Sequence, residues 1–210
     1  RFGDKSIDRI IKKIESQPHK LNDYKIRNGL ATLSNETFFF AVAEEDETYF
    51  YRQYEGEKYP IEKAICIDVA KPNVMRTEDD LKMKMEKAIF PYDVEHKIIA
   101  ETMLQEKFPM AYAFLHRYKE QLLQRDKGKA KNYSAWYEYG RTQGMNNKGK
   151  KLLIPYMAER GVAIKCNRGD VLFYCGYALF CNDDKMLEVL KRIIESNVFW
   201  YYIENTSKPY

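Results

Sequence analysis

Residues 136–148 contain side chains that could recognise a nucleic acid. This segment reads Trp-Tyr-Glu-Tyr-Gly-Arg-Thr-Gln-Gly-Met-Asn-Asn-Lys. Arg141 can donate two parallel hydrogen bonds to the edge of a guanine. Amide side chains can pair in the same way with adenine, and the segment supplies three of them, at Gln143, Asn146 and Asn147. The segment therefore offers the types of side chain that reading a DNA duplex requires.

Positive charge is concentrated around this segment. Residues 125–151 include eight Lys or Arg side chains and two acidic ones, a net charge of 8 − 2 = +6. The whole chain carries +4, from 35 basic and 31 acidic residues, so the rest of it carries +4 − 6 = −2. The lysines at the end of the segment, Lys148, Lys150 and Lys151, could neutralise phosphates. Such contacts supply affinity that does not depend on base sequence.

Composition leaves two interpretations of this segment open. In the first, Gly140 and Gly144 give the backbone the freedom to approach a groove of DNA closely. In the second, the segment is a solvated basic loop, and its aromatic residues are buried beneath it. Composition alone favours neither interpretation.

Signatures of catalysis are absent from the sequence. It has no Gly-x-x-x-x-Gly-Lys-Ser/Thr loop, no Gly-x-Ser-x-Gly and no His-Glu-x-x-His. The carboxylate pairs at 79–80 and 183–184 fall at expected helix starts, where capping explains them better than acid–base catalysis. We therefore expect no catalytic residue in this chain and no enzymatic activity of the chain by itself.

The cysteine and histidine patterns predict no metal site. No two cysteines form a Cys-x-x-Cys pair, and the three histidines are not spaced as ligands to them. The cysteines lie in apolar or strand-like surroundings and are expected to act as small buried hydrophobic residues: Cys66, Cys166, Cys175 and Cys181.

The overall composition is typical of a folded domain. The chain has 210 residues, of which 45% are hydrophobic and 31% charged. It shows no signal peptide and no apolar run of membrane length, so no membrane association and a cytoplasmic location are expected. It starts at Arg1 without a methionine, and its last residues form no obvious terminating element, so we expect a fragment of a longer protein.

Apolar periodicity predicts three main helices that would support the segment. One covers residues 6–17, and a second runs over 109–124. The apolar stripe of the second helix comprises Ala111, Phe114, Leu115, Tyr118 and Leu122. The third should begin at Asp183 or Asp184 and turn apolar residues inward: Met186, Leu187, Leu190, Ile193 and Ile194.

Short strands are predicted around these helices. The expected strands cover residues 37–43, 48–54, 64–69, 89–92, 152–154, 162–165, 171–174 and 177–181. Thr77 and Asp80 resemble a capping box before a short helix that would end near residue 87. This mixture predicts an α+β fold, with mixed small sheets and helices packed around them.

Three stretches of the sequence together resemble the C-terminal specificity domain of TaqI-like, gamma-class adenine-N6 DNA methyltransferases, which include fused restriction–modification enzymes. The first is Lys25–Leu33, followed by three phenylalanines, which is similar to the Gly-x-x-Thr turn that enters the family's first recognition strands. The second joins Ile89–Tyr92 to a long helix that ends in Arg-Asp at 125–126. The third and most specific is Trp136–Gly144, followed by Lys151–Pro155.

The resemblance implies a DNA target-recognition domain over residues 21–210, either undivided or in two lobes that divide near 126–135. Residues 1–20 would form a helix that connects it to an upstream catalytic domain, although this helix could equally belong to the core of the recognition domain. In such enzymes S-adenosylmethionine is the methyl donor, and the target adenine is flipped out of the duplex. The cofactor and the catalytic motif would belong to the upstream domain, so this chain itself would hold no cofactor.

The residues and the resemblance together give twelve candidates for DNA contact: Arg27, Asn28, Thr32, Trp136, Tyr137, Arg141, Gln143, Asn146, Asn147, Lys148, Lys150 and Lys151. The expected partners are double-stranded DNA and the chain's own upstream catalytic domain, in a bacterial cytoplasm and in contact with the nucleoid. One alternative is a stand-alone specificity subunit that acts with a separate methyltransferase chain. Another is a protein-interaction scaffold, which would leave the +6 segment unexplained. The residues that contact the DNA bases vary within the family, so the resemblance does not assign any particular base contact to this chain.

Overall fold

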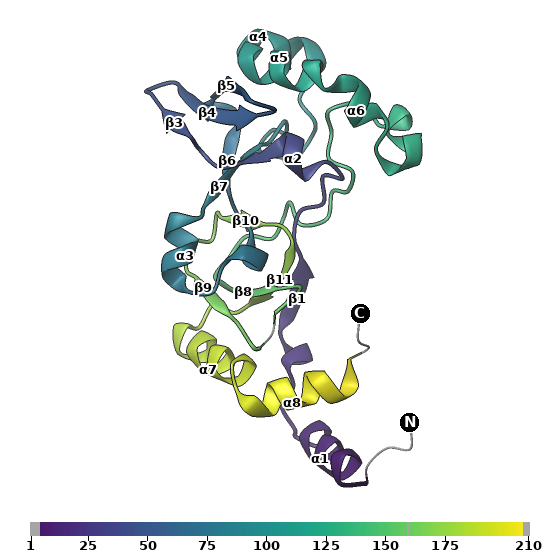
Figure 1. The fold of residues 1–210 in the computed structure, drawn as a ribbon, viewed down its shortest axis with the longest axis vertical. Coiled ribbons are helices and arrows are strands. Elements are labelled where there is room, and N and C mark those ends of the chain that lie inside the picture. The colour runs from purple at the N-terminus through teal and green to yellow at the C-terminus, as the bar shows by residue number, and fades with distance from the viewer. Residues whose placement is uncertain (1–4, 159, 208–210) are drawn as a thin grey trace.

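Strands form three small sheets, and helices pack around them, in the computed structural model, which describes residues 5–158 and 160–207. This is the α+β fold that the sequence predicts. Figure 1 shows the elements arranged along one long axis. A hairpin with its covering helices lies at one end, and α1 (Lys5–Glu15) and α8 (Asn197–Thr206) lie at the other.

The first sheet lies next to the end formed by α1 and α8. It has the order β1 (Lys25–Asn28), β11 (Gly176–Phe180), β8 (Lys151–Pro155) and β9 (Ile164–Cys166), and all neighbouring strands are antiparallel. The helix α7 (Asp184–Ile194) covers one face and buries Leu187, Leu190 and Ile194. Asp183 caps α7, as the sequence predicts. The other two predicted inner residues, Met186 and Ile193, are 37% and 44% exposed.

The second sheet joins segments that are far apart in the sequence. Its order is β10 (Leu172–Phe173), β6 (Cys66–Ala70), β7 (Glu86–Ile89) and β2 (Phe39–Phe40). β10 pairs in parallel with β6, and the other pairs are antiparallel. Cys175 lies in the left-handed region, with φ of 50°, in the two-residue turn from β10 into β11. This turn ties the second sheet directly to the first.

The third sheet and three helices form the other end of the molecule. Its strands are β3 (Glu44–Glu45), β4 (Tyr49–Tyr54) and β5 (Glu57–Glu62). The helix α4 (Glu101–Lys107) leads into α5 (Pro109–Arg117), which packs on β5. The buried Glu62 carboxylate accepts the N–H groups of Met110 and Ala111, at 2.7 and 2.9 Å. A carboxylate at this place stabilises the first turn of α5.

The second predicted helix is interrupted. α5 ends at Arg117, Tyr118 has non-helical backbone angles (φ −104°, ψ 18°), and α6 (Lys119–Leu123) follows. The predicted apolar stripe is nevertheless confirmed, because all five of its residues are buried. The break therefore changes the direction of the chain without changing which residues face the core.

Other element boundaries also differ from the prediction. The predicted strand at 37–43 begins instead as α2 (Asn35–Phe38). The capping box of Thr77 and Asp80 is confirmed, but its helix α3 (Glu78–Met83) ends earlier than predicted because β7 starts at Glu86. Neither α4 nor β5 was predicted. Both are short, and their apolar residues show too few periods to predict an element from the sequence.

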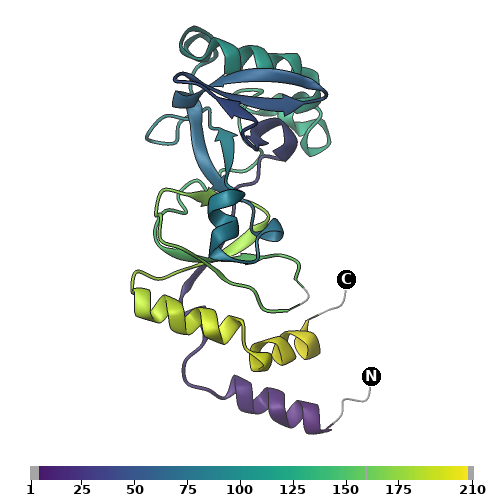
Figure 2. The ribbon, with the colours of Figure 1, turned by 60° about the vertical axis from the view of Figure 1, so that its left-hand side comes forward.

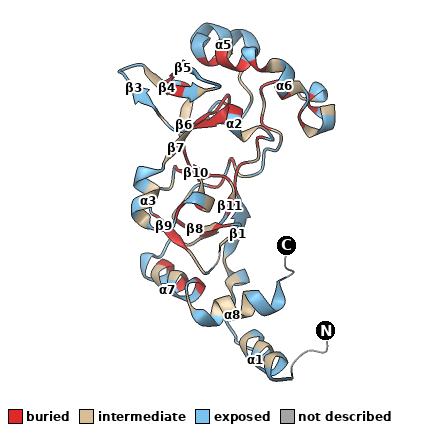
Figure 3. Ribbon diagram, in the orientation of Figure 1, coloured by how far each residue is buried: buried red, intermediate tan, exposed pale blue. Residues whose placement is uncertain are grey.

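Among residues 5–158 and 160–207, the buried hydrophobic residues form three cores. Figure 3 shows buried residues along much of the long axis. The largest contains Phe38 and Leu115 as well as Tyr137 and Tyr174. Because these residues come from both sides of 126–135, that segment does not divide the chain into two lobes with separate cores.

The helix α1 lies outside the three cores. None of its residues is buried, and it contacts α8, where the Tyr202 hydroxyl donates to Glu15 at 3.0 Å. Figure 2 shows α1 beyond α8 at the end of the molecule. The structure therefore does not support the interpretation of residues 6–17 as a helix of the core. Among the described residues, no helix combines the length and the apolar character needed to cross a bilayer.

Candidate nucleic-acid interface

The loop at residues 140–148, here called the recognition loop because the sequence predicts that it reads DNA, is fixed to the chain that follows β1. The N–H groups of Gly140 and Arg141 donate to the carbonyls of Thr32 and Ala31, at 3.1 and 3.0 Å. Gly144 has φ of +88°, and a Cβ there would lie 2.7 Å from the backbone of Gly29. The loop therefore needs glycine at this position both for its conformation and for this close backbone approach.

A buried arginine holds the chain that leads into this loop. Arg125 is 6% exposed, and its guanidinium donates four hydrogen bonds of 2.8–2.9 Å to backbone carbonyls. The acceptors are the carbonyls of Leu122, Thr32, Glu138 and Trp136. Burial lowers the pKa of Arg125, but arginine stays charged at neutral pH. This one side chain therefore ties together the end of α6, the segment after β1 and the entry to the recognition loop.

The aromatic residues before the loop are structural. Trp136 and Tyr137 are buried, so the expectation that they contact DNA is wrong for this structure. The Trp136 indole donates to the Glu101 carboxylate at 3.0 Å, and the Tyr137 hydroxyl donates to the Ile99 carbonyl at 2.6 Å. Tyr139 is also buried. The rings of Trp136 and Tyr137 are thus buried, and their polar atoms already have hydrogen-bond partners within the protein.

Three further candidates are buried and must also be removed from the interface. The Thr32 hydroxyl donates to Asn35 at 2.7 Å. The Asn147 amide donates to the Asn28 carbonyl at 2.6 Å, which closes the recognition loop against β1. Lys151 is fully buried and donates to the Val171 carbonyl at 2.8 Å, so it cannot reach a phosphate from this position.

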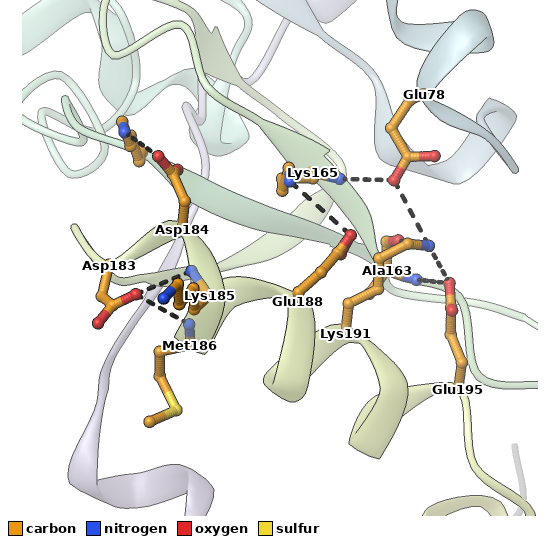
Figure 4. Close-up of polar contacts among 11 residues, drawn as sticks. Glu78, Ala163, Lys165, Asp183, Asp184, Lys185, Met186, Glu188, Lys191 and Glu195 are labelled. Carbon is orange, nitrogen blue, oxygen red and sulfur yellow. Dashed lines mark hydrogen bonds and ion pairs between the residues drawn. The ribbon is translucent and has the colours of Figure 1, made fainter.

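Lys150 is half-buried and already paired with an acid. Its ammonium lies 2.7 Å from the carboxylate of Asp184, whose pKa it lowers. Two carboxylates at α7 are also paired with lysines, as Figure 4 shows for Glu188 with Lys165 of β9 and for Glu195 with Lys191. Lys150, Lys165 and Lys191 on this side of the first sheet are therefore each paired with a carboxylate.

Six of the twelve candidates remain exposed: Arg27, Asn28, Arg141, Gln143, Asn146 and Lys148. The side chains of Gln143, Asn146 and Lys148 form no hydrogen bond or ion pair with any part of the chain that the structure describes. Four of the six lie on the recognition loop, and the backbone of Asn28 contacts it. The structure thus brings five of the twelve predicted residues to one region of the surface, whereas the exposed Arg27 side chain contacts its neighbour, the Ile26 carbonyl.

The basic character of this region survives the burial of two cations. Of the eight basic residues at 125–151, Arg125 and Lys151 are buried, which leaves six basic and two acidic side chains at the surface, or 6 − 2 = +4. Three of the six are exposed lysines of the 3₁₀ segment η4 (Asp126–Asn132): Lys127, Lys129 and Lys131. Asp126 of this segment contacts Arg141, so these lysines adjoin the recognition loop.

Two exposed tyrosines beside Asn28 were not among the predicted residues. Tyr156 and Tyr177 are 45% and 43% exposed, and their rings meet edge to face at 4.7 Å. The Tyr156 hydroxyl donates to the Asn28 side chain at 3.3 Å. Tyrosine is so frequent in this chain, with 17 copies, that type alone could not single them out.

The structure offers little for metal or thiol chemistry. Within residues 5–158 and 160–207, no three His, Cys, Asp or Glu side chains come together in a way that could hold a metal ion. The cysteines are free: Cys166 is buried, and the others are partly buried. Burial raises the pKa of Cys66 to about 12, so its thiol stays protonated and unreactive at neutral pH.

No model of a known protein family matches the chain, and no curated protein matches it.

Proposed function

We propose that this chain binds double-stranded DNA and reads its sequence with the recognition loop. In this proposal the bound DNA presents an adenine for N6 methylation by an S-adenosylmethionine-dependent domain outside this chain. The observation that supports DNA reading is the combination of a fixed loop backbone with outward polar side chains that lack a partner. Gln143, Asn146 and Lys148 have no partner among the described residues. Arg125 holds the chain that leads into the loop, and Asn147 ties the loop to Asn28.

Rigidity matters because base recognition depends on geometry. A side chain that must pair with one base edge loses little conformational entropy on binding if its backbone is already held. Exposed amides can form two hydrogen bonds with adenine, and an arginine can do so with guanine. The recognition loop presents both types within six residues, from Arg141 to Asn146.

The surrounding charge supports a polyanionic partner. The surface of residues 125–151 carries +4, and Lys148 is exposed without an acidic neighbour in contact. Phosphate contacts from such lysines would set the register of the loop on the duplex, while the amides would set the sequence. The methylation part of the proposal depends on the resemblance of the three sequence stretches to adenine-N6 methyltransferases.

Selection from a random duplex library tests this proposal. The 210-residue chain should enrich one motif, and Gln143→Ala or Asn146→Ala should each lose about 1–3 kcal/mol of discrimination at a single position of it. Gln105→Ala, at an exposed glutamine on α4, serves as the control and should enrich the same motif as the unchanged chain. Enrichment of no motif by the unchanged chain would overturn the proposal.

A further inference from the structure

The Arg125-Asp126 pair at the end of α6 places one residue in the interior and the next beside the recognition loop. Arg125 is fixed by its four carbonyl acceptors. Directly after it, Asp126, Lys127 and Gly128 have φ of 52°, 57° and 82°. Left-handed backbone at two consecutive non-glycine residues is costly and is maintained only where the surrounding structure determines it. This turn directs the Asp126 side chain to the guanidinium of Arg141.

The contact itself is too weak to have a large role in stability. The Asp126 carboxylate lies 3.4 Å from Nη1 of Arg141, whose side chain is 49% exposed. Exposed ion pairs of this kind contribute little to folding. The same Nη1 atom also donates to the Gly140 carbonyl at 2.7 Å. Neither of these hydrogen bonds uses the Nε–Nη2 edge of the guanidinium. This edge can donate two hydrogen bonds to a guanine.

We propose that Asp126 is a positioning residue that sets the orientation of Arg141 for reading one base pair. The inference rests on the proposed function and adds to it a specificity-determining residue that itself touches no DNA base. A long arginine side chain has many rotamers, and holding it by one nitrogen reduces the entropy lost when its opposite edge pairs with a base. The buried Arg125 fixes where Asp126 lies, and Asp126 together with the Gly140 carbonyl holds Nη1 of Arg141, so that one orientation of the guanidinium is favoured.

Asp126→Asn is the informative substitution. Asparagine tolerates left-handed backbone, so the turn is kept while the carboxylate charge is removed. Asp79→Asn is a matched control, because Asp79 forms an exposed ion pair with Lys82 at the same N–O distance of 3.4 Å, on α3. Both variants change the net charge equally, so a general electrostatic effect on duplex affinity appears in both.

The experiment applies the random-duplex selection to the unchanged chain, Asp126→Asn, Asp79→Asn, Arg141→Lys and the double variant Asp126→Asn/Arg141→Lys. Asp126→Asn should lose about twofold to fivefold discrimination, the effect of removing an exposed ion pair, at the single position that Arg141→Lys also loses, with an unchanged melting temperature. In the Arg141→Lys background the further change at 126 should have no additional effect at that position.

Three results would overturn the role of Asp126. The first is that Asp126→Asn enriches the same motif as the unchanged chain while Arg141→Lys enriches an altered motif. The second is a loss spread over all positions together with a lower melting temperature, which would show that Asp126 only supports the fold. In the third, the unchanged chain enriches no motif, which overturns the proposed function and this inference with it.

Discussion

Asn146 and Asn147 are adjacent and chemically identical, yet they have different roles. The Asn147 side chain is buried and donates to the Asn28 carbonyl, whereas Asn146 is exposed without a partner among the described residues. A buried amide must be hydrogen-bonded within the protein, and an exposed one is free to bind something else. The local backbone of the loop decides between these two states, and residue type does not.

Tyr137 illustrates how a buried polar group makes stability depend on pH. Burial raises its pKa to about 12, above the ordinary value near 10. Below pH 10 the hydroxyl is neutral in both the folded and the unfolded chain, so its full contribution to stability is present. Between pH 10 and 12 only the unfolded chain loses the proton, and the contribution is lost progressively.

Tyr137→Phe should therefore be less stable than the unchanged chain by about 1 kcal/mol near neutral pH, because the hydrogen bond to Ile99 is removed. The difference in melting temperature should shrink as pH rises from 10 to 12. Tyr177→Phe, at a 43% exposed ring, is the comparison variant. A difference for Tyr137→Phe that stays constant up to pH 12 would show that the hydroxyl is not held neutral by burial.

At the scale of elements, the approach of the recognition loop to the end of β1 is set by glycines. Gly144 has φ of +88°, and a Cβ there would meet the backbone of Gly29 and Leu30. Gly56, in the β4–β5 turn, has a similar φ of +82° but open space around it. The two positions separate the effect of backbone strain from the effect of packing.

Gly56→Ala should destabilise the chain by about 1 kcal/mol, the cost of left-handed backbone alone. Gly144→Ala should cost about 3 kcal/mol or more, because two backbone segments must also move apart. Urea denaturation of both variants measures these free energies of unfolding. Equal losses at the two sites would contradict the close approach of the loop to β1.

At the scale of the whole molecule, the parts with a regular period were the predictable ones. The stripe from Ala111 to Leu122 repeats every three or four residues, so its burial followed from the sequence even though Tyr118 breaks the helix. Asp183 was predictable as a cap because it precedes an apolar periodic run. The small strands were located approximately, but their pairing across distant segments, such as β10 with β6, has no local signal.

The buried charged residues could not be predicted either, because their burial also leaves no local signal in the sequence. Arg52 is almost fully buried and donates to the carbonyls of Thr37 and Glu36, both at 2.6 Å. Arg125 and Lys151 likewise use carbonyl acceptors, which every residue possesses, so no pattern of residue types reveals them. The sequence therefore indicated the basic segment but could not separate its structural cations from its solvent-facing ones.

The salt dependence of duplex affinity tests whether DNA lies on the exposed side of the recognition loop. Lys148 and Lys151 are three residues apart, but only Lys148 faces solvent. Anisotropy titrations of a labelled duplex at several salt concentrations should show, for Lys148→Ala, a log–log slope smaller in magnitude by about 0.9 and an unchanged melting temperature. Lys151→Ala should leave the slope unchanged and destabilise the fold by about 1–3 kcal/mol, because it orphans a buried carbonyl. The account would be contradicted by equal slopes for Lys148→Ala and the unchanged chain, or by a duplex affinity that does not depend on salt.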